Sequence, residues 1–94
     1  KQMIKVYIIS YDLKNPGQNY EKLLALIKSY GKWARLGGSS YLVVSTQTAV
    51  QIRDNLKTAL DSNDKLFVGT LTLPAAWAGM PDEVSNWIRN NLTE

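Results

Sequence analysis

The feature that most constrains the fold is an apolar stretch near the start of the chain, from Met3 to Leu13. β-Branched and aromatic residues dominate this stretch, which is typical of a strand because such side chains pack well on a pleated surface. Apolar side chains occupy both alternating sets of positions: Ile4, Val6 and Ile8 in one set, and Tyr7, Ile9 and Tyr11 in the other. A strand with both faces apolar is covered on both sides, so we expect it at the centre of its sheet.

The next part of the chain predicts a helix and a hairpin. The turn at Pro16-Gly17 leads to an amphipathic helix, with Asn19 as its N-cap and Gly31 as its C-terminal stop. Residues 33–36 and 41–46 then read as two strands, and the glycine pair at 37–38 makes them a hairpin. The inward positions of the helix are Tyr20, Leu23, Leu24 and Ile27.

The second half predicts a helix, a strand and a final helix. Thr48 and Gln51 form a capping box that opens a second helix, whose inward positions are Ile52, Leu56, Ala59 and Leu60. Residues 61–64 read as a turn, and 66–71 as a strand in which Gly69 indicates a bulge or a close backbone approach. A last helix spans 81–92, with Pro81 at its start and an apolar stripe formed by Val84, Trp87, Ile88 and Leu92.

This order of elements, β-α-β-β-α-β and a final helix, predicts an α+β fold of the ferredoxin-like type in a single domain over residues 1–94. The sheet is expected to be antiparallel and four-stranded, with the first and last strands at its centre. We expect the added helix to cover the face that carries Tyr7, Ile9 and Phe67; otherwise a second subunit covers it. The surplus of apolar residues predicts a homodimer, built through the sheet face or the last helix.

Composition narrows the possible chemistry. The chain of 94 residues has no cysteine and no histidine, which excludes disulfides, thiolate metal sites and histidine-based catalysis. No run of eighteen apolar residues occurs, so we expect a soluble, cytoplasmic protein that does not span a membrane. The net charge of +3 permits contact with phosphate groups without demanding it.

Asp12, at the end of the first strand, is the strongest candidate for chemistry. With a second carboxylate it could hold Mg²⁺, because one aspartate alone binds that ion poorly. The alternative is that Asp12 only accepts backbone N–H bonds in the following turn, which is the more common role of such an aspartate.

Aromatic and basic residues suggest a second candidate site. Tyr7, Tyr11, Trp33 and Tyr41 with Lys5, Lys32 and Arg35 could form a stacking surface for RNA or DNA. The alternative is that these rings belong to the core or to a dimer interface, with a solvated basic rim. Trp77 is either a cap on the core or a contact for a protein partner, and the candidate partner-binding residues are Trp77, Trp33, Tyr41, Lys14, Lys32 and Arg35.

Several segments of the chain resemble the small bacterial and phage proteins often labelled SinR-like, and the resemblance covers nearly the whole chain. The matching segments are 10–13, 27–33, 40–46, 60–68, Thr48-Ala49 with Ile52-Arg53-Asp54, and Trp87-Ile88 with Asn91-Leu92. That family has no firmly assigned activity, so the resemblance implies the fold more than the function.

The pair Tyr11-Asp12 is also similar to a pair at the end of the first strand in the small CRISPR-adaptation nucleases (the "Cas-two" family) and the VapD toxins. That resemblance implies a ferredoxin-like homodimer in which two aspartates face each other around magnesium, with Asp12 and Tyr11 as catalytic residues. The arginine pair common there is replaced here by Lys14-Asn15-Pro16-Gly17. We therefore expect a non-enzymatic protein that binds a protein or nucleic-acid partner; the alternative is a magnesium-dependent endonuclease centred on Asp12.

Overall fold

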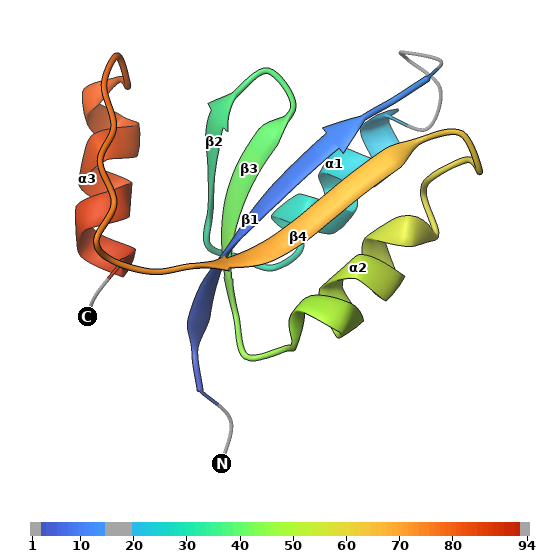
Figure 1. Cartoon of the computed structure of the whole chain (residues 1–94), viewed down its shortest axis with the longest axis horizontal. Helices are drawn as coiled ribbons and strands as arrows, with labels where there is room; N and C mark the ends of the chain where they lie inside the picture. The colour runs from blue at the N-terminus through green and yellow to red at the C-terminus, as the bar shows by residue number, and fades with distance from the viewer. Residues whose placement is uncertain (1–2, 15–19, 93–94) are drawn as a thin grey trace.

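The computed structural model describes residues 3–14 and 20–92, and the elements in them follow the predicted order (Figure 1). The strands are β1 (Lys5–Asp12), β2 (Trp33–Gly37), β3 (Ser40–Ser45) and β4 (Lys65–Leu71). The helices are α1 (Tyr20–Lys28), α2 (Ala49–Lys57) and α3 (Asp82–Asn91). Periodicity, capping residues and turn residues in the sequence together located each of these elements.

The four strands form one antiparallel sheet in the order β2-β3-β1-β4. With the helices it makes the predicted ferredoxin-like α+β fold with an added C-terminal helix. Strand β1 lies between β3 and β4, which confirms its central position. The prediction of a central last strand is wrong, because β4 pairs only with β1 among the described strands and lies at the margin of the sheet.

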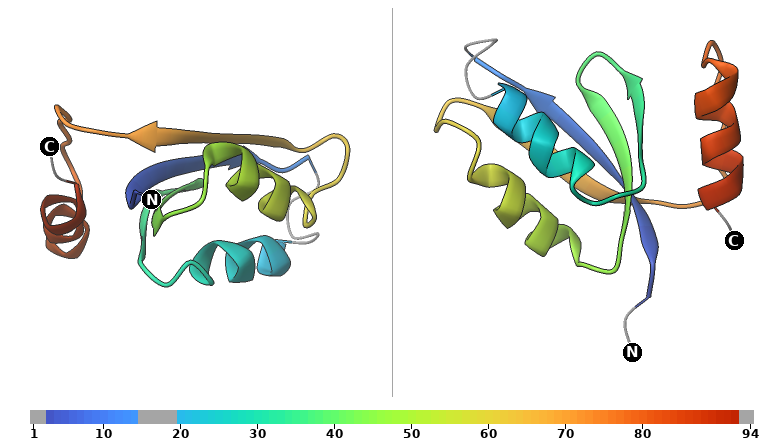
Figure 2. Two further views of the ribbon diagram at one scale, coloured as in Figure 1. Left: turned by 90° about the horizontal axis from the view of Figure 1, so that it is seen from below. Right: turned by 180° about the vertical axis from the view of Figure 1, so that it is seen from behind.

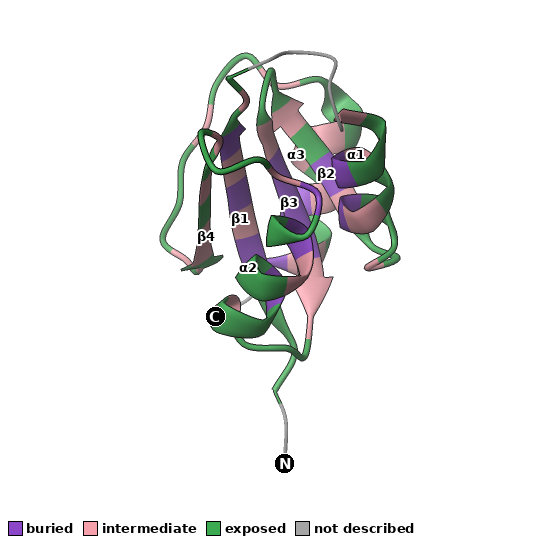
Figure 3. Cartoon of the chain, turned by 90° about the vertical axis from the view of Figure 1, so that its right-hand side faces the viewer, coloured by how far each residue is buried: buried purple, intermediate pink, exposed green. Residues whose placement is uncertain are grey.

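Helices α1 and α2 lie on one side of the sheet and α3 lies on the other (Figures 2 and 3). An apolar cluster occupies each of the two faces. The face covered by α1 and α2, called here the α1/α2 face, carries the larger cluster. The face covered by α3, called here the α3 face, carries the smaller one. The buried members of the larger cluster are Tyr7, Ile9, Tyr11, Leu23, Ile27, Tyr41, Val43, Ile52, Leu56 and Ala59. Those of the smaller cluster are Val6, Leu42, Ile88 and Leu92.

The last helix does cover the second face of the sheet, but not the residues that we expected beneath it. Tyr7 and Ile9 point to the α1/α2 face, whereas Val6 on the same strand packs with α3. Strand alternation separates two faces but does not say which of them the helices cover. Phe67 lies opposite Ser10 in the register and therefore on the α3 face, where its side chain is nevertheless exposed.

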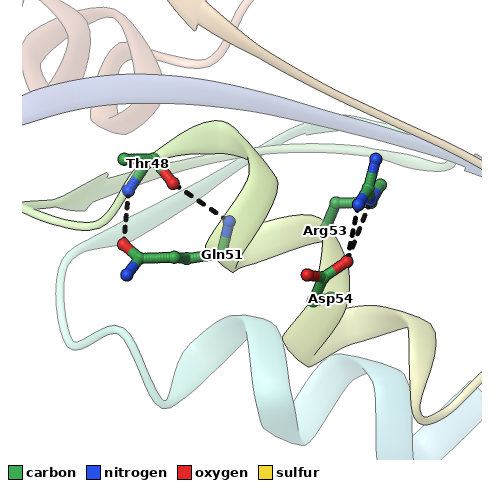
Figure 4. A network of polar contacts seen from close by, with 4 residues as sticks. All are labelled: Thr48, Gln51, Arg53 and Asp54. Carbon is green, nitrogen blue, oxygen red and sulfur yellow. Dashed lines mark hydrogen bonds and ion pairs between the residues drawn. The ribbon is translucent and has the colours of Figure 1, made fainter.

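Several predictions made from local sequence signals are confirmed by the structure. The Thr48 hydroxyl accepts a hydrogen bond from the Gln51 N–H, and the Gln51 side chain accepts one from the Thr48 N–H, at 3.1 and 2.9 Å (Figure 4). Gly31 follows α1 with φ +92°, which is a left-handed conformation that favours glycine. Asn19, the predicted N-cap of α1, lies outside the described residues. None of the described helices is long and apolar enough to cross a membrane.

The capping box gives a direct test of what starts α2. Replacing Thr48 with alanine leaves the Gln51 N–H without its partner, so the free energy of unfolding should fall by about 0.5–2 kcal/mol. Urea unfolding monitored by circular dichroism measures the change. Thr72→Ala, at an exposed position outside any helix, is the matched control and should stay near the wild-type value. Equal values for both variants would show that the box does not stabilise α2.

Candidate interaction site

Asp12 is the last residue of β1, and its side chain is exposed. Lys65 lies opposite it on β4. Within residues 3–14 and 20–92, no hydrogen bond or ion pair reaches the Asp12 carboxylate, and no group of three or more side chains could hold a metal ion. A magnesium site at Asp12 would need a second carboxylate, which a second subunit could supply.

The turn at residues 61–64 contains the carboxylate that ties β1 to β4. One oxygen of Asp64 accepts a hydrogen bond from the Lys14 N–H, and the other accepts one from the Asp61 N–H, both at 2.8 Å. The predicted turn at 61–64 is therefore confirmed. Asp64 performs the backbone-binding role that we considered for Asp12, while the predicted turn at Pro16-Gly17 lies outside the described residues.

Tyr11 lies deep in the cluster on the α1/α2 face. Its ring lies between those of Tyr20 and Tyr41, at centroid distances of 6.2 and 6.5 Å. Burial raises the pKa of the Tyr11 hydroxyl well above its ordinary value, and burial also raises the pKa of Tyr41. The Tyr11 phenol is thus neutral in the folded chain, and its hydroxyl is buried without a hydrogen-bond partner among the described residues.

The other rings considered for nucleic-acid stacking also face α1 and α2. Tyr7 and Tyr41 are buried, and Trp33 is half-buried with its ring 6.0 Å from that of Tyr41. The Lys28 ammonium lies 4.8 Å from the centre of the Trp33 ring. Tyr7, Tyr11 and Tyr41 are core residues, which is the alternative stated above, and a base cannot stack on them in this fold.

The basic residues considered for partner binding are exposed but separated. Lys32 precedes β2 and Lys14 follows β1. Because β2 and β1 both run antiparallel to β3, these two lysines lie at opposite ends of the sheet. Arg35 lies on β2, where its guanidinium donates to the Gly38 carbonyl at 3.1 Å. These residues therefore do not form one basic patch.

Trp77 packs on the α3 face, away from the other candidates. Its indole N–H donates to the Ser85 hydroxyl at 3.0 Å, and the Arg89 guanidinium lies 5.8 Å from the ring centre. The half-buried ring is part of the cluster that contains Val6 and Leu42. This arrangement is that of a cap on the core, one of the two roles considered for Trp77.

Two large apolar side chains are exposed beside strand β4: Phe67 at 64% and Val50 of α2 at 56%. Phe67 points to the α3 face, whereas α2 lies on the other face of the sheet. A hollow lined by both side chains must therefore lie along the outer margin of β4. This hollow of about 210 Å³, called here the β4 margin, is lined by Ala49, Val50, Arg53, Leu66, Phe67 and Val68.

Gly69 explains how Phe67 is held at this margin. A Cβ atom at position 69 would lie 2.9 Å from Cε2 of Phe67, so the ring lies over the glycine. The register between β1 and β4 is regular through Gly69. The close approach at Gly69 is thus made by an aromatic side chain and not by another backbone segment, and the predicted alternative of a bulge is wrong.

Sequence reasoning did not identify the β4 margin. Two signals were available: Val50 lies outside the inward stripe of α2 that contains Ile52 and Leu56, and Phe67 has glycine two positions later on the same face. Neither signal indicates an exposed surface until β4 is known to lie at the margin of the sheet.

No protein-family model matches this chain, and no solved structure matches it. The resemblances to the SinR-like and Cas-two families stay predictions.

Two tyrosines on the same face of β1 allow a matched test of the core. The Tyr7 hydroxyl donates to the Gln47 carbonyl at 2.6 Å, whereas the Tyr11 hydroxyl has no hydrogen-bond partner among the described residues. Tyr7→Phe should lower the free energy of unfolding by about 0.5–1.5 kcal/mol, because it removes a satisfied hydrogen bond. Tyr11→Phe should be neutral or stabilising, because it removes a desolvated polar atom that gains nothing by folding. Urea denaturation compares the two, and a Tyr11→Phe loss as large as that of Tyr7→Phe would contradict this description.

Proposed function

We propose that the protein is a non-enzymatic interaction module that binds another protein chain through the β4 margin. The observation that carries the proposal is the exposure of Phe67 and Val50 on the two sides of a marginal strand. Exposed apolar side chains beside unpaired strand backbone are the two features that strand-addition interfaces use.

Energetic considerations support this surface as a contact. Burying apolar surface stabilises an interface by about 25 cal/mol per Å², and aromatic anchors near its centre carry a large share of the energy. Phe67 is such an anchor, since Gly69 fixes its ring and its outer surface stays in water. The pattern differs from that of Trp77, whose ring is already engaged with α3.

The distribution of charge favours a protein over a nucleic acid. Binding to nucleic acid relies on clustered lysine and arginine side chains that neutralise phosphates. Lys14 and Lys32 lie at opposite ends of the sheet, and Arg53, the basic residue of the β4 margin, is paired with Asp54 at 2.8 Å. The margin is mainly apolar and its charge is partly neutralised, which suits a protein surface.

Site-specific photo-crosslinking in the source cells tests this proposal. A photoreactive phenylalanine analogue at position 50 should give discrete crosslinked products, whereas the same analogue at Glu21, an exposed residue of α1, should not. Phe67→Ser in the position-50 chain should reduce those products by about tenfold or more, because it removes the aromatic anchor. Products of equal yield from positions 50 and 21, or no effect of Phe67→Ser, would contradict the proposal.

A second candidate function is the magnesium-dependent endonuclease centred on Asp12. The favouring observation is that the Asp12 carboxylate is exposed at the end of the central strand, where a second subunit could reach it. Two such carboxylates could hold one Mg²⁺, and the ion would neutralise charge that develops on the phosphate. Tyr11 would support the strand end beside it.

Asp12→Ala separates this candidate from the binding module. If the nuclease function holds, the variant should lose magnesium-dependent cleavage of RNA and DNA by about a hundredfold or more, with an unchanged circular dichroism spectrum. Asp54→Ala, at an exposed position on α2, is the matched carboxylate control. A wild-type chain that cleaves neither substrate with Mg²⁺ or Mn²⁺ rejects the endonuclease.

A further inference from the structure

The direction of the backbone groups in β4 follows from one hydrogen bond of β1. The Tyr11 N–H donates to the Ser39 carbonyl at 3.1 Å, so the backbone groups of Tyr11 point towards β3. Backbone groups of successive strand residues point to alternate sides, so those of Ser10 and Asp12 point towards β4. Their partners Phe67 and Lys65 point back towards β1.

The intervening residues of β4 are therefore the ones that face outwards. The N–H and C=O groups of Leu66, Val68 and Thr70 point away from β1, along the free margin of the sheet. No described strand lies on that side. Strand β2, at the other margin, has five residues and a register shift between Arg35 and Gly37, which are features that discourage pairing. Strand β4 has seven residues in regular register and no proline.

We infer that the occupant of the β4 margin is a second copy of this chain, with the two β4 strands paired antiparallel about a twofold axis at Val68. This inference rests on the proposed function and names its partner. In this register Leu66 lies opposite Thr70 of the other copy, and Val68 lies opposite its own equivalent. All three outward-facing residues are then paired, with about six hydrogen bonds across the interface.

The side chains fit this register as well as the backbone does. Phe67 falls opposite Gly69 of the other copy, in a pair that forms no hydrogen bonds and whose Cα atoms are therefore close, about 4.5 Å apart. Because positions 67 and 69 exchange under the twofold operation, each Phe67 faces a glycine and not the other ring, while its own ring lies over Gly69 of its own chain. A register centred on Phe67 would instead bring the two rings directly opposite each other.

The charges near the axis do not oppose this pairing. Lys65 of each copy falls opposite Leu71, so the two lysines lie six residues apart along the strand, about 20 Å. That distance exceeds the screening length of about 8 Å at physiological salt. Arg53 lines the margin beside Val68, and both its Nε and its Nη2 donate to Asp54 Oδ1, at 3.0 and 2.8 Å. Each copy therefore brings an arginine that is already paired within its own chain towards the axis.

This dimer excludes the shared magnesium site. Asp12 lies opposite Lys65, at the end of the interface. The two Asp12 residues would thus be about 20 Å or more apart by the same strand spacing. A magnesium ion binds its ligands at about 2.1 Å, so one ion could not bridge them.

Sedimentation equilibrium of the purified chain from about 10 to 500 μM tests the inference. The wild type should show a monomer–dimer equilibrium. Thr70→Pro should raise the dissociation constant by at least about tenfold, because it removes an outward N–H that β1 does not use. Thr70→Val, which keeps that N–H, is the matched control and should dimerise like the wild type.

A second pair of variants keeps the inference testable if the proline variant does not fold. Phe67→Ser should weaken the dimer, and Ile4→Ser, which also removes an exposed apolar side chain, should not. If the wild type remains monomeric at 500 μM, a second copy of the chain is not the partner at the β4 margin. The same conclusion follows if the wild type dimerises but neither Thr70→Pro nor Phe67→Ser weakens the dimer. If position 50 then crosslinks to a different protein, the proposed function still holds, although this dimer does not form.

Discussion

The burial of both faces of β1 is the constraint on which the rest of the structure depends. Tyr7 and Ile9 bury one face under α1 and α2, and Val6 buries the other under α3. Each fully buried side chain of this size contributes about 1.5–3 kcal/mol, so a single strand anchors two clusters that would otherwise be separate. The strand must then be covered above and below and paired on both sides, which requires three layers.

Among the described strands, β4 is left with one unpaired side after β1 has a neighbouring strand on each of its sides. It completes the pairing of β1, but its own outer side lacks a neighbour in the described part of the chain. Helix α2 covers Leu66 and Val68 only partly, and Phe67 stays exposed outside the cluster that packs with α3. The same topology that protects β1 thus leaves backbone groups and an aromatic ring available for a partner, and this links the fold to the proposed interaction.

Sequence alone was sufficient for the elements and for the central position of β1, because periodicity and capping are local signals. It was not sufficient for the position of β4. Apolar residues on both faces of a strand indicate that both faces are buried, but they do not indicate whether the strand has one neighbouring strand or two. Nor could it assign Tyr7 to a face, because alternation has no absolute direction. The β4 margin was missed for a related reason: Val50 and Phe67 lie 17 positions apart in the sequence, and only the crossover through α2 brings them together.

The central claim is that the outward-facing groups of β4 become paired with those of a second chain. Amide hydrogen exchange, measured residue by residue by NMR at low and high protein concentration, tests it most directly. The account predicts that exchange slows with concentration at Leu66, Val68 and Thr70, while Phe67, Gly69 and Leu71, already bonded to β1, do not change. Exchange that is independent of concentration at all six residues, or that slows equally at all of them, would contradict the account.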